Sequence, residues 1–278
     1  MTPLHIELCW GPREPGKKNA PESASPLPPG RGASGFSGSP DSLETFLERL
    51  RDRCAHDGEC DGLDRPSRIQ IQAERARSLA DEFGILKTAP FTWTELQVEE
   101  PSLWIGSEHF VDFSPEDGRY HKTTVPPVFG RTPAVLSHPV PNLRGEPGIR
   151  QAIEFVPATP LEYLERWSLS NEVFGDNVRL ASVVEWPDGA LSFGITQPQY
   201  HGAPAHPRDI EHFFREAGWT RLTDPSGHLV FYNYAFQVIA IDAVGRNCYL
   251  TDGELQPFDV ILCQPGPELE EFLRIYPG

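Results

Sequence analysis

Residues 239–260 read IAIDAVGRNCYLTDGELQPFDV, an apolar run that ends at Asp242, followed by Asn247 and, twelve residues later, Asp259. The alternating segments 248–251 and 254–258 predict two short strands. The Asp-Gly pair between them favours a two-residue hairpin turn, because both positions tolerate positive φ. A hairpin folds back on itself. We therefore expect it to bring Asp259 to the end of the ribbon where Asn247 lies, beside the loop that presents Asp242.

Three oxygen-bearing side chains gathered at one end of a hairpin suit phosphoryl transfer. One carboxylate can orient and deprotonate an attacking hydroxyl, while an amide and a second carboxylate hold Mg²⁺ against phosphate oxygens. The alternative is an ordinary surface hairpin whose carboxylates face water, since Asp is common in turns and loops.

The order Asp, four residues, Asn, a hairpin and Asp resembles the catalytic loop and metal-binding Asp of protein kinases. The strings GSEHFVDFSPEDGRYHKTT (106–124) and EYLERW (162–167) are similar to the small kinase domain of the polyvalent proteins of phages and mobile elements. This resemblance covers roughly residues 100–262. It implies an α+β, two-lobed protein-kinase-like fold with a reduced C-terminal lobe.

The resemblance also implies a function, an ATP- and Mg²⁺-dependent transfer of the γ-phosphoryl group to a hydroxyl of a protein or small molecule. In it, Asp242 is the base, and Asn247 and Asp259 hold Mg²⁺ and the nucleotide. The alternative is a catalytically dead pseudokinase that binds a nucleotide or a partner. A third reading is an interaction domain without nucleotide, in which the aspartates are turn residues.

The first lobe supplies the remaining phosphate contacts in this reading. Gly106 lies in the loop that covers the nucleotide, and Lys122 contacts the phosphates from a strand. Thr159 begins a helix with a capping box, and either Glu162 or Glu165 on it pairs with Lys122. The family pattern favours Glu162, whereas helical spacing points Glu165 more inward.

The resemblance places a hinge between the lobes at about residues 196–200. A strand gives way to a loop there, in the sequence Thr-Gln-Pro-Gln-Tyr. Gln197 and Gln199 are therefore expected at the adenine edge of the nucleotide.

The chain divides into three parts by composition. Between Gly11 and Pro40, 18 of 30 residues are Pro, Gly or Ser, which predicts a disordered tail over 1–40 that could recruit a protein partner. Residues 41–90 form a helical segment, with a first helix from Asp41 and a second at about 66–83. Residues 91–278 form the kinase-like domain, with an N-lobe at about 91–196 and a C-lobe at about 201–278.

The elements expected in the third part follow from periodicity and turn residues. Strands are predicted at 91–98, 104–113, 119–124, 178–186, 190–196, 219–222 and 228–238. Helices are predicted from Thr159 to Asn171, at 207–218 and at 267–275. The Pro- and Gly-rich stretch 126–157 is expected to be an irregular insert.

Charge and cysteine usage limit the partners and the compartment. A formal net charge of −16 argues against a nucleic-acid surface, which needs a basic face. No apolar stretch approaches the roughly 20 residues that span a bilayer, and the N-terminus lacks a signal-peptide layout, so we expect a cytoplasmic protein away from membranes. The five scattered cysteines are expected as reduced thiols, and Cys54 with Cys60 as a loop without metal.

Overall fold

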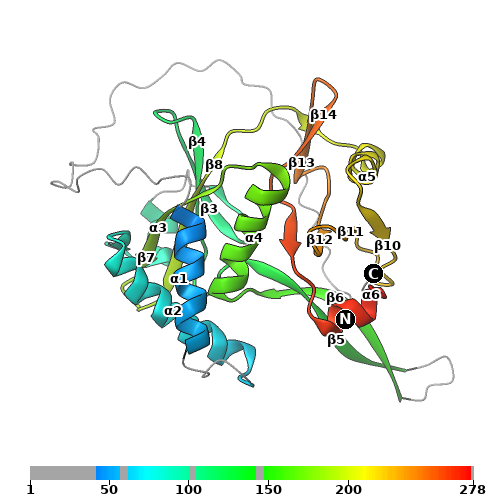
Figure 1. Cartoon of the computed structure of the whole chain (residues 1–278). Coiled ribbons are helices and arrows are strands. Elements are labelled where there is room, and N and C mark those ends of the chain that lie inside the picture. The colour runs from blue at the N-terminus through cyan, green and yellow to red at the C-terminus, as the bar shows by residue number, and fades with distance from the viewer. Residues whose placement is uncertain (1–41, 57–61, 100–103, 142–146, 277–278) are drawn as a thin grey trace. The chain divides into compact units, whose positions relative to one another are not determined.

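The computed structural model describes residues 42–56, 62–99, 104–141 and 147–276, which combine helices and strands in a mixed α+β fold (Figure 1). The predicted tail over 1–40 and the Cys60 thiol lie outside the described residues. Among the described residues, every helix is too short or too polar to cross a membrane.

A six-stranded sheet forms the first layer of the structure. Its spatial order is β1-β7-β8-β4-β3-β2, and all neighbours are antiparallel except β1 and β7. The strand β8 lies between β7 and β4, and seven of its eight residues are buried. Its strands are β1 (Leu86–Thr88), β2 (Trp104–Ile105), β3 (His109–Ser114), β4 (Arg119–Thr124), β7 (Arg179–Glu185) and β8 (Leu191–Pro198).

Three helices pack against this sheet, α1 (Ser42–His56), α2 (Arg65–Glu82) and α4 (Pro160–Phe174). All three contribute apolar side chains to one core that also contains Phe193 of β8. The helix α4 begins as predicted, since Thr159 and Glu162 form a reciprocal capping box and Gly175 ends it at φ +67°. The first two predicted helices and the α4 helix are confirmed.

The prediction of a strand at 91–98 is wrong, because a helix, α3 (Trp93–Glu99), occupies it. The Thr92 hydroxyl accepts the amide of Glu95 at 3.3 Å, and the Glu95 carboxylate accepts the Thr92 amide at 2.8 Å. This is the same capping box that starts α4. The predicted strand at 104–113 is split into β2 and β3 by a turn in which Gly106 N–H bonds to the carbonyl of His109.

The expectation of an irregular insert at 126–157 is also wrong. The segment forms a long antiparallel hairpin, β5 (Arg131–Pro141) with β6 (Pro147–Pro157), in continuous register. Its prolines are tolerated because a two-stranded ribbon has a free edge on each side, where a missing N–H costs nothing. The hairpin is fixed to a distant turn, since Ser226 Oγ accepts the Ile153 amide at 2.8 Å.

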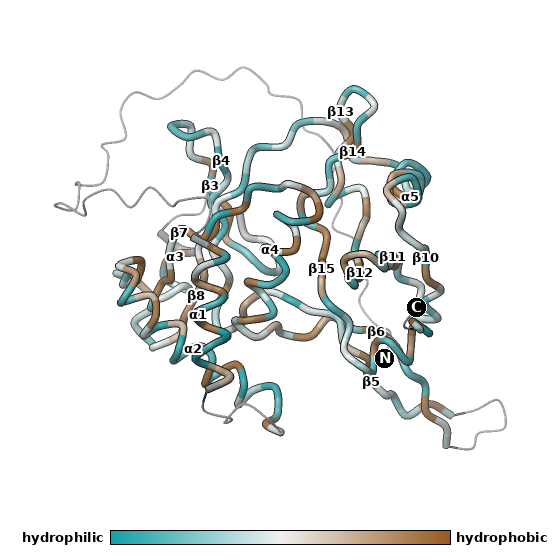
Figure 2. The backbone as a smooth tube through the Cα atoms, in the orientation of Figure 1, coloured by the Kyte–Doolittle hydropathy of each residue, from teal (hydrophilic) through white to brown (hydrophobic). Residues whose placement is uncertain are grey.

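A second, four-stranded sheet has the order β10-β11-β12-β15. Figure 2 shows its inner strands as hydrophobic, and every residue of β11 and β12 is buried. The expected strand at 228–238 is interrupted, because Asn233 accepts the amides of Ala235 and Phe236 and turns the chain. The strands are β10 (Thr220–Leu222), β11 (Val230–Asn233), β12 (Val238–Ile241) and β15 (Ile261–Cys263).

The remaining elements flank this second sheet. The helices α5 (Pro207–Glu216) and α6 (Pro267–Leu273) confirm the two predicted there, and each packs an apolar face inward. A small sheet contains β9 (Ala203–Pro204), β13 (Cys248–Thr251) and β14 (Glu254–Pro257). The turn between β13 and β14 is the predicted Asp-Gly pair, with Asp252 at φ +52° and Gly253 at φ +88°.

Candidate functional site

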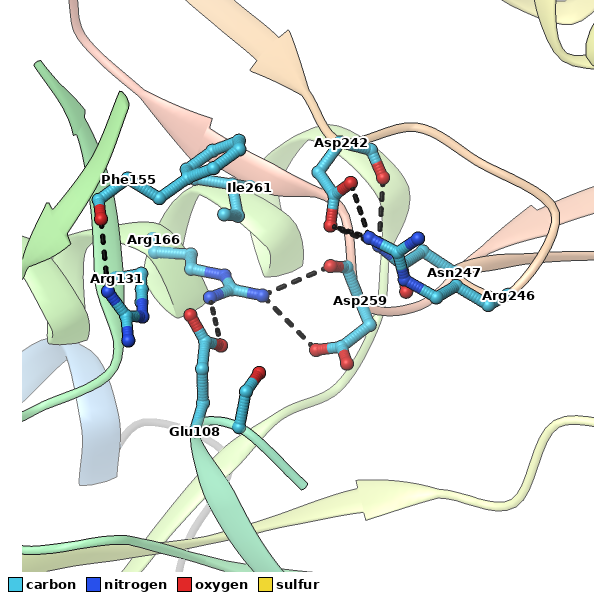
Figure 3. A pocket seen from close by; sticks show the side chains of 10 residues that line it. Glu108, Arg131, Phe155, Arg166, Asp242, Arg246, Asn247, Asp259 and Ile261 are labelled. Carbon is cyan, nitrogen blue, oxygen red and sulfur yellow. Dashed lines mark hydrogen bonds and ion pairs between the residues drawn. The ribbon is translucent and has the colours of Figure 1, made fainter. Parts of the chain in front are cut away.

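A polar cleft of about 370 Å³ brings together segments that are far apart in the sequence (Figure 3). Its walls come from the β2–β3 turn, the β5–β6 hairpin, α4, the loop after β12 and the start of β15. The lining residues are Ser107, Glu108, Arg131, Phe155, Arg166, Asp242, Arg246, Asn247, Asp259 and Ile261. Three of the predicted site residues, Asp242, Asn247 and Asp259, therefore share one cleft.

The loop after β12 is closed around Asp242. This residue has φ +60°, a left-handed conformation that is uncommon for residues other than glycine but is found at functional sites. Asn247 Nδ2 donates to the carbonyl oxygen and to Oδ2 of Asp242, both at 2.8 Å. Arg246 Nη2 donates to both carboxylate oxygens, at 2.7 and 2.9 Å. The Asp242 carboxylate is thus fixed at the cleft wall.

The β13–β14 hairpin brings Asp259 back to this loop. Cys248 pairs with Pro257 at the open end of the hairpin, and the Phe258 amide donates to the Asn247 carbonyl at 3.0 Å. Asp259 follows directly and lines the cleft beside Asn247. The geometry predicted from the Asp-Gly turn is confirmed.

Lys122, on strand β4 of the six-stranded sheet, forms an ion pair with Asp259. Its side chain on β4 is buried, with Nζ 3.4 Å from Asp259 Oδ1 and 5.2 Å from the centre of the Trp167 ring. Burial alone would raise the pKa of Asp259, but the positive charges of Lys122 and Arg166 hold it at about 2. The Asp259 carboxylate is therefore ionised at any pH at which the protein would be assayed.

Arg166 is the central residue of the site, and the sequence analysis missed it. Its side chain is 3 % exposed, and its guanidinium bridges Glu108 Oε2 at 2.9 Å and Asp259 Oδ1 at 3.1 Å. It also donates to the Asp259 carbonyl at 3.0 Å. A signal was present, because Arg166 falls three residues after Tyr163 and directly before Trp167, on the buried side of α4.

The expected pairing of Lys122 with Glu162 is wrong. Glu162 is committed to the capping box at the start of α4 and to Arg65, which it binds through both oxygens at 2.7 and 3.2 Å. The alternative partner fails too, since Glu165 pairs with Arg51 at 3.0 Å. The anion beside Lys122 is Asp259, supplied by the loop before β15 and not by the helix.

The predicted phosphate contact Lys122 and the predicted nucleotide contacts Gly106, Gln197 and Gln199 are not among the residues that line the cleft. Gly106 lies in the β2–β3 turn, next to the lining residues Ser107 and Glu108. Gln197 is 1 % exposed, and its amide donates inward to the Phe258 carbonyl at 2.5 Å. Its side chain is therefore not free to read an adenine edge. Gln199 is half-buried just after β8, which extends to Pro198 and shortens the expected hinge loop.

A second buried network, also missed, lies behind the cleft. Asp176 is 3 % exposed and accepts hydrogen bonds from Ser170 Oγ at 2.6 Å, Gln197 Nε2 at 3.2 Å and the Tyr200 hydroxyl. Burial raises the pKa of Asp176 to about 7, and the bonds from Ser170 and Gln197 only partly oppose it. The network joins the end of α4 to the end of β8, and Gln197 extends it to Phe258.

The free oxygens of the cleft suit a hard divalent cation. Among the described residues, Asn247 Oδ1 and Asp259 Oδ2 accept no hydrogen bond. The other polar atom of each side chain, Asn247 Nδ2 or Asp259 Oδ1, is already engaged. The part of the chain described here contains no cluster of three His, Cys, Asp or Glu side chains. One carboxylate and one amide are a sufficient protein contribution for Mg²⁺, which completes its shell with water and phosphate oxygens.

Comparison of this chain with protein-family models, with curated proteins and with solved structures finds no match.

Proposed function

We propose that this protein is an ATP- and Mg²⁺-dependent phosphotransferase with a two-lobed, protein-kinase-like arrangement. The observation that carries the proposal is the meeting of Asp242, Asn247 and Asp259 at one cleft, with the buried Lys122 of β4 paired to Asp259. Asp242, Asn247 and Asp259 line the cleft, and Lys122 Nζ lies 3.4 Å from Asp259 Oδ1. Two carboxylates, an amide and a lysine are the groups that phosphoryl transfer requires.

Each side chain has a defined task in this proposal. Asn247 and Asp259 would hold Mg²⁺, which neutralises charge on the phosphate oxygens when it is bound. Lys122 contacts the phosphates from the sheet, where its burial strengthens the interaction. Asp242 orients the acceptor hydroxyl and accepts its proton. Arg246, whose side chain is 70 % exposed, can leave Asp242 when an acceptor arrives.

The order of elements supports the same proposal. The strand that carries Lys122 is followed, after the inserted β5–β6 hairpin, by the helix α4, the β7–β8 hairpin, a connecting segment and then the loop of Asp242. The sheet with α4 corresponds to an N-lobe, and the β10-β11-β12-β15 sheet belongs to a C-lobe. The helix α4 contributes Arg166 to the site, whereas the corresponding helix of a protein kinase is expected to contribute a glutamate.

A second candidate, a nucleotide-binding pseudokinase, is favoured by one feature of the ion pairs. Asp259 Oδ1 already has two cationic partners, Lys122 and Arg166. Both oxygens of Asp242 are bound by Arg246. A site whose carboxylates stay neutralised in this way would bind a nucleotide without transferring its phosphate.

The test is a thermal-shift titration with ATP and Mg²⁺, separately and together, followed by an ATP-turnover assay. ATP at about 100 times Kd should stabilise the folded protein by roughly 2.7 kcal/mol. The variant Asp259→Asn should lose the Mg²⁺-dependent shift and the turnover. Asp252→Asn is the matched control, because it makes the same chemical change at the hairpin turn, where Asn is equally tolerated.

The outcomes separate the candidates. A Mg²⁺-dependent shift with turnover, both lost in Asp259→Asn and kept in Asp252→Asn, supports the phosphotransferase. A shift without turnover identifies the pseudokinase. No shift under any condition rejects both.

A further inference from the structure

Arg166 is placed in a way that its packing alone does not require. It lies on the inner side of α4, is 3 % exposed, and has its guanidinium 4.8 Å from the centre of the Trp167 ring. A guanidinium is costly to bury, and it is retained where its charge is paired and its donors are used. Arg166 meets this condition by binding residues from two other segments, Glu108 and Asp259 (Figure 3).

The bonds to Asp259 are directional. Arg166 Nη2 donates both to the main-chain carbonyl and to Oδ1 of Asp259, at 3.0 and 3.1 Å. Two acceptors of one residue held by one donor group fix the side-chain torsion of that residue. Lys122 Nζ also reaches Oδ1, so both cations lie on the same oxygen. Oδ2 accepts no bond from any described residue and is left for a ligand in the cleft.

Glu108 completes the arrangement on the other side of the guanidinium. It comes from the β2–β3 turn and accepts Arg166 Nη1 through Oε2 at 2.9 Å. The two carboxylates balance the charges of Lys122 and Arg166, so the group of four is neutral. Arg166 therefore remains anchored by Glu108 if a cation binds to Asp259 and weakens the second ion pair.

One donor of Arg166 is left over. Its Nε is buried and has no acceptor within the described part of the chain. Buried donors without a partner are rare in folded proteins. Because Nε is inaccessible to water, a ligand in the cleft would reach it only if the side chain moved.

We infer that Arg166 is a positioning residue, which holds Asp259 Oδ1 and the Asp259 carbonyl so that Oδ2 faces the cleft as the metal ligand. Glu108 in turn holds Arg166 and links the β2–β3 turn to the metal site. This inference rests on the proposed function. In this arrangement Arg166 on the helix and Asp259, which Arg166 shares with Lys122, take the place of the lysine–glutamate pair expected of a kinase-like site.

The test compares Arg166→Met, Arg166→Lys and Glu108→Gln with the wild type. Removal of a partner that orients a metal ligand typically costs about 10- to 100-fold in activity or metal affinity. For Arg166→Met we expect kcat to fall by this factor and the Mg²⁺ concentration needed for half-maximal activity to rise. The KM for ATP should stay within about threefold. Arg166→Lys should recover part of kcat, since it keeps a donor and the charge. Glu108→Gln, which disturbs the core least, should show a smaller loss of the same kind.

Tyr163→Phe is the matched control for damage to α4. It removes the buried hydrogen bond of 2.9 Å between Tyr163 on α4 and His109 on β3, and it leaves the hydrogen bonds of Asp259 in place. We expect it to lower the melting temperature and to keep kcat. A wild-type kcat in Arg166→Met, or an equal loss of kcat in Tyr163→Phe, would overturn the inference.

Hydrogen–deuterium exchange of the segment 258–261 supplies a readout that does not depend on turnover. Exchange should increase there in Arg166→Met and not in Tyr163→Phe, because only the former releases the Asp259 backbone. An inert wild type would reject the proposed function, and the exchange result would still decide whether Arg166 holds this segment. Unchanged exchange in Arg166→Met and in Glu108→Gln would reject the inference that Arg166 holds this segment.

Discussion

Asp176 makes the stability of this protein depend on pH in the direction opposite to an ordinary ion-paired carboxylate. Its carboxyl group is buried at the end of α4 and is surrounded by neutral donors, Ser170, Gln197 and Tyr200. Burial favours the protonated form more strongly than the Ser170 bond, the nearby charge of Lys122 and the Gln197 bond favour the ionised form, and it raises the pKa from 3.8 to about 7. The substitution Asp176→Asn removes the titration and keeps the size of the side chain.

The sign and the magnitude follow from linkage. Between about pH 4 and about pH 7 the folded state holds a proton on Asp176 that the unfolded state has lost, so stability falls as the pH rises. The contribution of this group is fully present below the unfolded pKa and is lost through the folded pKa. The difference between 3.8 and about 7 corresponds to roughly 4 kcal/mol at about 1.4 kcal/mol per pH unit.

Urea unfolding at several pH values checks this prediction. From about pH 5 to about pH 7, the free energy of unfolding of the wild type should fall by about 2 to 3 kcal/mol relative to that of Asp176→Asn. Taking the difference between the two proteins cancels the contribution of every titratable group that they share. Asp188→Asn, an exposed position in the β7–β8 turn, should follow the wild type. Parallel pH curves for the wild type and Asp176→Asn would refute the reasoning.

Three further predictions concern the fold around the site. Glu162→Ala should lower the free energy of unfolding by about 1 kcal/mol through loss of the capping box, with ATP turnover unchanged; a fall in kcat would restore Glu162 to the active site. Gly245→Ala would place a Cβ 2.7 Å from the Ala205 carbonyl oxygen, so we expect about 1 to 3 kcal/mol of destabilisation by thermal unfolding, and an unchanged melting temperature would contradict the close approach. Cys248 is fully buried, and burial raises its pKa to about 12, so this thiol should not react with a thiol reagent near neutral pH until the protein unfolds; rapid labelling of Cys248 in the native protein, located by peptide mapping, would disprove this.

Helices and hairpins with chemical signals at their ends were predictable from the sequence. The capping box at Thr159 places the start of α4, and the Asp-Gly turn places the β13–β14 hairpin. The helix α3 was missed although Thr92 and Glu95 carry the same box, because the aromatic and β-branched residues around them favour a strand. At this position the capping box decides the structure against the local strand propensity.

The β5–β6 hairpin shows a different limit of sequence reading. Its strands contain prolines, which normally argue against a strand. They fit here because the ribbon is two-stranded, and that fact depends on which segments lie beside it in the folded chain. Ile153 makes the dependence concrete, since its amide bonds to Ser226 and its side chain packs against the second sheet.

The residues of the candidate site also fall into those that local sequence brings together and those that tertiary packing brings together. Asp242, Asn247 and Asp259 are joined by a local hairpin, so spacing alone predicts that they meet. Arg166 and Glu108 are 58 residues apart and belong to a helix and a turn whose packing no local pattern specifies. The expected glutamate partner of Lys122 was wrong for this reason, because the choice among ion-pair partners is made by tertiary placement.

The two residues Phe258 and Asp259 show how that placement is enforced. They lie between β14 and β15, outside any strand ladder, so their backbone groups must find partners elsewhere. Asn247 accepts the amide of Phe258, Gln197 donates to its carbonyl, and Arg166 donates to the carbonyl of Asp259. These partners come from the β12 loop, the end of β8 and α4. The backbone that carries the Asp259 carboxylate is thus held by three separate elements, which ties the geometry of the site to the packing of the fold around it.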